Sequence, residues 1–204
     1  MKQKNELNDL RKVESRDIMR YYVAYYDIEK KLVNAIRNGK GEEKEKACHT
    51  YINSYMGIGR NFKTNSSPML LITIENMLLN EGNLGVEELS DRYVRNELVS
   101  RPEIKNVKVA ASKLLWLYEP ETIIMDNNNM NVLKAYDYST YVQKWNELFE
   151  SKLPEIDEVI SSLFPNFDNV MNERWFKMRV FDLFLLSIYK ESDTSDNTLI
   201  SISV

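Results

Sequence analysis

The sequence predicts an all-α fold, and three observations support this prediction. Apolar residues recur three and four positions apart, the spacing of an amphipathic helix, through most of residues 16–189. Glycine and proline are scarce, with 6 and 5 among 204 residues, which argues against folds that need many turns. Hydrophobic residues make up 43% of the chain and charged residues 28%, so a sizeable core can form beneath a polar surface.

The predicted helices are separated by residues that end helices. They are expected over 16–37, 43–56, 69–79, 86–99, 107–118, 127–134, 139–151, 154–163 and 170–189. Gly39 follows the first helix and Gly82 the third, and glycine is common just past a helix C-terminus. Pro102, Pro120 and Pro154 are expected to end the fourth, fifth and seventh helices, because proline lacks the amide hydrogen that a helix interior uses.

Two of the helix starts carry capping residues. Ser66 or Ser67 stands before Pro68, an order typical of an N-cap followed by proline in the first helical turn. Asp126 follows a short apolar step over 123–125, and its carboxylate is expected to cap a helix that begins at about Asn127.

The chain is expected to form one domain with a tail. Residues 1–190 are predicted as a single helical domain of two lobes. From Glu191 onwards serine, threonine and aspartate dominate, so residues 191–204 are predicted as a polar tail, in which a short strand from Leu199 is an alternative.

Composition excludes several classes of function. Cys48 is the only cysteine and His49 the only histidine, so we expect no disulfide within the chain, no metal site and no cofactor. The net charge of −4 provides no general attraction for nucleic-acid phosphates. No apolar run reaches the ~20 residues of a membrane span, and no signal peptide is recognisable, so a cytoplasmic protein without a membrane partner is expected.

Two short motifs look chemical but have simpler interpretations. The segment 57–62 contains two glycines, but it lacks the third glycine and the preceding strand of a phosphate-binding loop, so a turn between helices is predicted. Cys48 and His49 are adjacent on a predicted helix, where neighbouring side chains diverge by about 100° and do not face each other.

The most informative stretch is residues 104–126. A short turn leads into a buried helix with Lys108 in its first turn, the helix stops at Pro120, and an extended apolar step ends at Asp126. This order of features resembles the helix-hairpin-helix DNA glycosylase superfamily, and within it the 8-oxoguanine DNA glycosylase type. The fold that this resemblance implies is a two-lobed glycosylase-like domain with a degenerate helix-hairpin-helix.

The resemblance also implies an activity and two catalytic residues. Lys108, with Val109 and Ala110 after it, matches the catalytic lysine of the family, and Asp126 matches its aspartate, six positions after Pro120. The implied protein is a glycosylase or glycosylase/lyase that acts on a nucleobase or a base-like group. Its lysine is the nucleophile, and its aspartate assists.

The residues themselves are compatible with these roles. A lysine in the first turn lies near the positive end of the helix dipole, and Lys105 and Lys113 add positive potential; both effects favour the neutral, nucleophilic amine. Lys105, Lys113 and Arg179 are the candidate substrate-binding residues. Arg179 lies three residues before Asp182 on the last predicted helix and, if buried, would form a second wall of the pocket. Lys113 is also a rival nucleophile, because it lies about 140° around the helix from Lys108 and the two cannot enter one pocket together.

The predicted hairpin departs from the family pattern. The turn over 102–106 has no glycine, and Glu103 would repel a phosphate, so binding to duplex DNA is expected to be weak or absent. The alternative function is a non-catalytic helical protein of a bacterial antiviral defence system, which would recognise a modified base or a partner protein from the same operon. A third alternative is an unrelated helical regulator.

Overall fold

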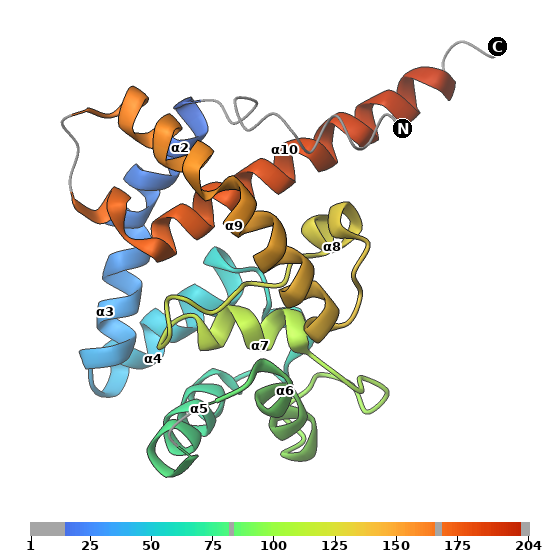
Figure 1. Ribbon diagram of the computed structural model, residues 1–204. Helices are drawn as coiled ribbons and strands as arrows, with labels where there is room; N and C mark the ends of the chain where they lie inside the picture. The colour runs from blue at the N-terminus through green and yellow to red at the C-terminus, as the bar shows by residue number, and fades with distance from the viewer. Residues whose placement is uncertain (1–14, 82–83, 166–168, 201–204) are drawn as a thin grey trace. The chain divides into compact units, whose positions relative to one another are not determined.

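The computed structural model describes residues 15–81, 84–165 and 169–200, and these residues form an all-α structure (Figure 1). They contain no strand, and an isolated antiparallel bridge joins Phe62 to Val99. The prediction of the fold class is therefore confirmed.

The helices follow one another with short connections. In chain order they are α2 (Ser15–Ala24), the π-helix η2 (Tyr25–Glu29), α3 (Lys30–Asn38), α4 (Gly41–Thr50), the π-helix η3 (Tyr51–Tyr55), the 3-10 turn η4 (Gly59–Asn61), α5 (Ser67–Glu81), α6 (Val86–Arg95), α7 (Lys108–Leu115), α8 (Asn127–Leu133), α9 (Tyr138–Leu163), the 3-10 turn η5 (Asn169–Asn172) and α10 (Arg174–Ile200).

The internal contacts divide the chain into two compact units. Unit 1 consists of the chain up to Tyr22 and from Asp126 onwards, and unit 2 consists of residues 23–125. In unit 1, α8 and α9 both pack against α10. In unit 2, α3 packs against α4, and α6 packs against α7.

Local signals placed the first helices correctly. The predicted helix over 16–37 is the run of α2, η2 and α3, and it ends at Gly39. A Cβ on Gly39 would lie 2.2 Å from the Ala35 carbonyl oxygen, so only glycine fits this close approach. The start of α5 at Ser67, with Pro68 in its first turn, is also as predicted, whereas Gly82 lies outside the described residues.

The prediction that the fourth helix continues to Val99 is wrong. α6 ends at Arg95, and Glu97 adopts the left-handed region with φ of 53°. Val99 then pairs with Phe62, so the backbone leaves the helix for a partner that is distant in sequence. Pro102 does not end this helix.

The fifth helix is also shorter than predicted. α7 ends at Leu115 instead of Tyr118, and the Leu117 and Tyr118 amides donate to the Leu114 and Leu115 carbonyls over 3.2 and 2.9 Å. These are the tighter turns with which helices often finish. The predicted helix is too long because Pro120 was expected to end it directly, whereas the helical hydrogen bonds stop about one turn before this proline.

Pro154 does not divide the following helix. α9 is continuous from Tyr138 to Leu163 with Pro154 inside it, so the predicted break is wrong. Proline in a helix interior costs about 3 kcal/mol. Phe149, Ile156 and Ile160, on either side of it, are all buried, and this packing offsets that cost.

The last helix begins later and continues further than predicted. η5 occupies residues 169–172, and α10 starts at Arg174 instead of residue 170. The backbone stays helical through Glu191 to Ile200, so Leu199 is in a helix and not in a strand. Residues 201–204 of the predicted tail lie outside the described residues.

The core of unit 1 is aromatic. Trp145 and Phe149 of α9 stack with their ring centroids 4.8 Å apart, and Phe181 of α10 meets Trp145 edge-on at 4.9 Å. All three side chains are almost completely buried. Contacts of this kind stabilise a core beyond the area that they bury, so α9 and α10 hold a rigid base for the polar residues beside them.

Candidate functional site

Lys108 is the first residue of α7, as the resemblance requires. Its Nζ lies 2.6 Å from Glu87 Oε1 of α6, and its side chain is 25% exposed. The Val107 amide donates to the buried Ser90 hydroxyl over 2.8 Å, so α6 also fixes the start of α7. A nucleophilic Lys108 must therefore leave Glu87 and lose its proton before it attacks.

The two neighbouring lysines differ in their surroundings. Lys105 lies exposed in the turn before α7. Lys113 is half-buried, and its backbone carbonyl accepts a hydrogen bond from the Tyr51 hydroxyl over 2.9 Å. This bond ties the last turn of α7 to η3, so a substitution that keeps the backbone of residue 113 also keeps this contact.

Asp126 caps α8, and this prediction is confirmed. Its backbone is extended, its carboxylate accepts from the Asn128 amide over 3.0 Å, and α8 begins at Asn127. The helix ends at Leu133, and the C-cap residue Lys134 has a left-handed φ of 48°. The cap holds the carboxylate of Asp126 in one orientation, because the side chain replaces a helical partner for the amide.

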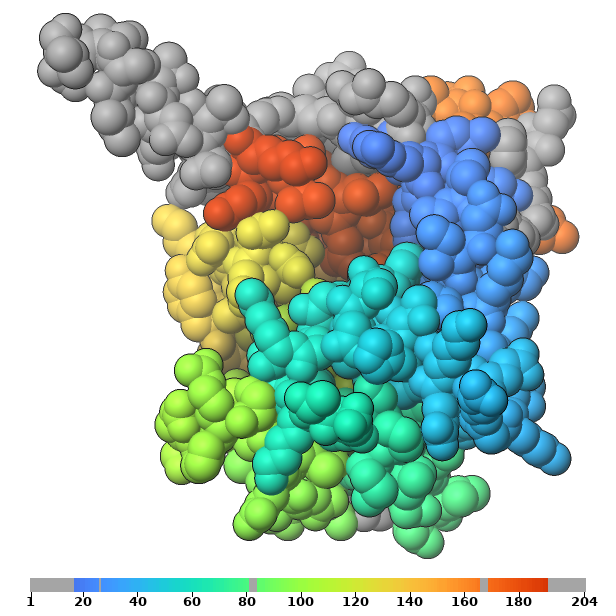
Figure 2. Space-filling model, turned by 180° about the vertical axis from the view of Figure 1, so that it is seen from behind, coloured from blue at the N-terminus to red at the C-terminus, as the bar shows by residue number. Residues whose placement is uncertain are grey.

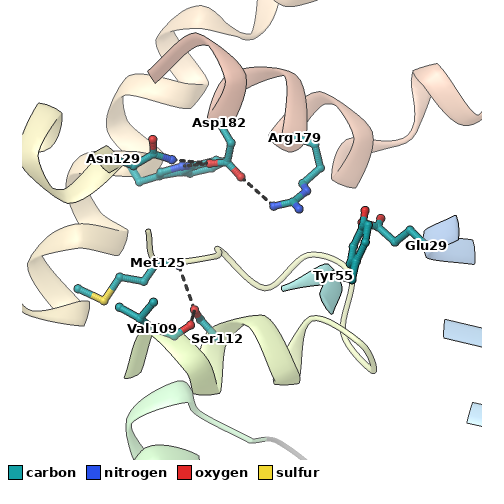
Figure 3. Close-up of polar contacts among 9 residues, drawn as sticks. Glu29, Tyr55, Val109, Ser112, Met125, Asn129, Arg179 and Asp182 are labelled. Carbon is teal, nitrogen blue, oxygen red and sulfur yellow. Dashed lines mark hydrogen bonds and ion pairs between the residues drawn. The ribbon is translucent and has the colours of Figure 1, made fainter. Parts of the chain in front are cut away.

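The apolar step before Asp126 is held by a residue that the sequence analysis missed. The Met125 amide donates to the Ser112 hydroxyl over 3.0 Å, and the same hydroxyl donates to the Val109 carbonyl over 3.0 Å (Figure 3). Ser112 is completely buried in α7. A serine between apolar residues of a buried helix is the signal that could have found it, since a buried hydroxyl needs partners.

The two predicted catalytic residues belong to different units. Lys108 belongs to unit 2, and Asp126 opens the second segment of unit 1. The pairing of their side chains stays a prediction, and so do the substrate-binding roles of Lys105, Lys113 and Arg179.

Unit 1 contains a polar cluster around Asp182 of α10. Asp182 Oδ1 accepts from Trp145 Nε1 over 3.0 Å and from Asn129 Nδ2 over 3.3 Å, and its Oδ2 accepts from Arg179 over 3.2 Å (Figure 3). The side chains of Asp182 and Arg179 are each 18% exposed. The guanidinium of Arg179 also lies over the Tyr21 ring, 5.7 Å from its centre. Arg179 is thus oriented by two contacts, within a network drawn from four helices, α2, α8, α9 and α10.

The cluster changes the acidity of its members. Burial raises the pKa of Asp182 to about 6, the charge of Asp126 acts in the same direction, and Arg179 and Trp145 oppose the shift. Burial, together with the carboxylates of Asp182 and Asp126, also raises the pKa of Tyr141, which is completely buried in α9. Asp182 can therefore take up or release a proton close to neutral pH, which ordinary aspartates cannot do.

Two carboxylates of unit 2, of Glu29 and Glu75, accept hydrogen bonds from residues distant in the sequence. Tyr55, at the end of η3, donates to the carboxylate of Glu29, a completely buried residue at the end of η2 (Figure 3). Glu75 accepts from Lys44 over 2.6 Å and from Tyr118 over 2.8 Å. Each carboxylate accepts from a residue of another helix, so these contacts cross-link the packed helices, and this structural role is enough to explain them.

A metal site and a membrane-spanning helix are both absent from the part of the chain that the structure describes. It holds no group of three or more side chains suited to binding a metal ion. Its helices include none that is both long and apolar enough to cross a membrane.

Comparisons of this chain with family models, with curated proteins and with solved structures give no match. The likeness to the glycosylase superfamily therefore rests on residues 104–126 themselves.

Proposed function

We propose that the chain is a glycosylase or glycosylase/lyase that acts on a nucleobase or a base-like group. Lys108 is the nucleophile and Asp126 the assisting carboxylate. The observation that carries the proposal is that both residues stand at helix N-termini, with Lys108 opening α7 and Asp126 capping α8. A capped carboxylate is held in one orientation, ready to face a positive charge that develops on the substrate.

The proposed chemistry forms a covalent intermediate with the sugar. The neutral amine of Lys108 bonds to the anomeric carbon while the bond from that carbon to the base breaks, and the base leaves with the electron pair and takes up a proton. The nitrogen loses a proton, and its lone pair then opens the sugar ring to give an imine, with the ring oxygen taking up a proton. Asp126 offsets the positive charge that develops at the anomeric carbon.

The Asp182 cluster supports this proposal from unit 1. A carboxyl group with a pKa of about 6 exchanges protons in the range in which base departure needs an acid. Arg179, which Asp182 and Tyr21 orient, is the proposed substrate-binding residue of this unit. We place the protein in the bacterial cytoplasm, where a single reduced thiol such as Cys48 is the ordinary state.

One observation favours a second candidate function. The Nζ atom of Lys108 is already paired with Glu87 over 2.6 Å, so its side chain is engaged in a contact between two helices. The second candidate is a non-catalytic binding protein of a bacterial defence system, which recognises a modified base or a partner protein. In that case Lys108 and Glu87 cross-link α6 and α7.

Trapping with borohydride separates the two candidates, because hydride reduces an imine to a stable amine. The protein is incubated with 8-oxoguanine and abasic-site oligonucleotides, single-stranded and duplex, in the presence of borohydride. We expect an adduct with the unaltered protein and with Lys113→Ala, and none with Lys108→Ala. Loss of the adduct in Lys113→Ala alone would move the nucleophile to Lys113, and no adduct with any substrate would support the binding protein.

A further inference from the structure

The outer side of α5 in unit 2 exposes apolar side chains. α5 packs against α4 and α6, and its inner side is buried through Leu70, Leu71, Ile74 and Met77. On the opposite side, Met69 is 50%, Ile72 44% and Leu79 83% exposed. Figure 2 shows part of this helix, coloured between cyan and green, on the surface that it draws. α5 therefore presents an apolar stripe to solvent.

The spacing of the stripe is that of a helix–helix seam. Met69, Ile72, Asn76 and Leu79 are separated by three, four and three residues, the repeat of the a and d positions in a coiled coil. At about 100° per residue, the four side chains lie within about 80° of the helix circumference. A stripe this narrow is typical of contact with one other helix, whereas packing on a broad core uses a wider face.

The polar residue in the stripe indicates what the other helix is. Asn76 is exposed between Ile72 and Leu79, and an apolar partner would leave its amide without hydrogen bonds. In a parallel pair of two identical helices, Asn76 lies opposite Asn76 of the second copy, and each amide can both donate and accept. One asparagine at an a position fixes the register of such a pair and favours two helices.

The charges of α5 do not oppose this pairing. Its only charged residues are Glu75 and Glu81. Glu75, next to the stripe, is already paired with Lys44 of α4, whose Nζ lies 2.6 Å from its Oε1. Two copies of the helix can therefore approach with little repulsion between their stripes.

We propose that α5 is a self-association surface, through which two copies of this chain form a parallel, two-fold symmetric dimer. Stable interfaces bury about 800 Å² on each partner, more than three partly exposed side chains provide. The dimer is therefore weak and depends on the protein concentration. The inference does not rest on the chemistry of Lys108, because no residue of α7 belongs to the seam.

Sedimentation velocity of the full-length protein from about 1 μM to about 1 mM tests for the dimer. We expect the sedimentation coefficient to rise from that of a monomer towards that of a dimer. Leu79→Glu should weaken association about tenfold or more, because a charge would be buried in the seam. Leu163→Glu, at a leucine of α9 that is 42% exposed, is the matched control and should associate as the unaltered protein does.

Charges placed at Asn76 test the parallel register. Asn76→Lys and Asn76→Glu each bring two like charges together in a parallel dimer, so each variant alone should associate about tenfold more weakly. An equimolar mixture of the two variants pairs lysine with glutamate and should associate at least as well as the unaltered protein. Thermal unfolding of each variant confirms that it is folded.

Three results would overturn the proposal. A sedimentation coefficient that does not change with concentration would assign the stripe to a helix of another protein. Equal weakening by Leu79→Glu and Leu163→Glu would show that association does not use α5. A mixture of Asn76→Lys and Asn76→Glu that associates no better than either variant alone would exclude the contact between the two copies of Asn76.

Discussion

Asp182 receives hydrogen bonds from three side chains that the sequence scatters along the chain. Only Arg179, three residues away, is a neighbour that helical spacing predicts. Asn129 of α8 and Trp145 of α9 donate hydrogen bonds to Asp182, and no local pattern in the sequence predicts such contacts. The cluster therefore had to come from the fold, whereas the cap that Asp126 forms on α8 was visible in the sequence.

The raised pKa of Asp182 predicts a pH dependence of stability. Its folded pKa of about 6 exceeds the ordinary value of 3.8, so between these values the folded state binds more protons than the unfolded state. The free energy of unfolding therefore falls as the pH rises from 4 to 6, by up to about 3 kcal/mol from this group. Urea unfolding at several pH values between 4 and 6 gives the free energy of unfolding as a function of pH. It should fall with rising pH more steeply in the unaltered protein than in Asp182→Asn, and equal pH dependences in the two proteins would contradict the prediction.

Ser112 is expected to matter for stability out of proportion to its size. Ser112→Ala removes the acceptor of the buried Met125 amide and leaves that amide without its partner. We expect a loss of about 1–3 kcal/mol in the free energy of unfolding, measured with urea. Ser162→Ala, at an exposed serine with the same three-residue bond to a helical carbonyl, is the control and should change it by less than about 0.5 kcal/mol. Equal effects of the two substitutions would contradict this role.

At the scale of elements, the sequence predicted well wherever the signal was local. Gly39 and Asp126 end and begin helices through bonds within a few residues, and both positions are as expected. The end of α6 was wrong because Val99 pairs with Phe62, a residue far away in the chain. The break predicted at Pro154 was also wrong because of tertiary packing, since the buried side chains of α9 offset the cost of an interior proline.

The cap of α8 predicts a difference between two substitutions of Asp126. Asp126→Ala should lower the free energy of unfolding by about 1 kcal/mol, because the Asn128 amide loses its acceptor, whereas Asp126→Asn should preserve the cap. Thermal and urea unfolding measure this. If Asp126→Asn keeps the stability but abolishes base release, the carboxylate has a chemical role. If activity falls only as far as stability falls in both variants, Asp126 acts as a helix cap and has no chemical role.

At the scale of the whole molecule, the net charge of −4 predicts poor binding of duplex DNA. Few phosphates can be neutralised by Lys105, Lys108 and Lys113, and the charge of Glu103 opposes them. A plot of the logarithm of the affinity against the logarithm of the salt concentration should therefore have a slope of about −1 to −2. Fluorescence anisotropy with a labelled duplex over a series of salt concentrations measures it. Tight binding at physiological salt with a steep slope would contradict this prediction.

The most direct test of the central claim is the mass of the trapped peptide. The protein is reacted with an abasic-site oligonucleotide and borohydride, digested, and analysed by mass spectrometry. If Lys108 is the nucleophile, the sugar remnant is found on Lys108, and the Asp182→Asn variant, which leaves that lysine in place, yields the same modified peptide. A remnant on Lys105 or Lys113, or an equal spread over exposed lysines, would contradict the assignment of Lys108 as the nucleophile.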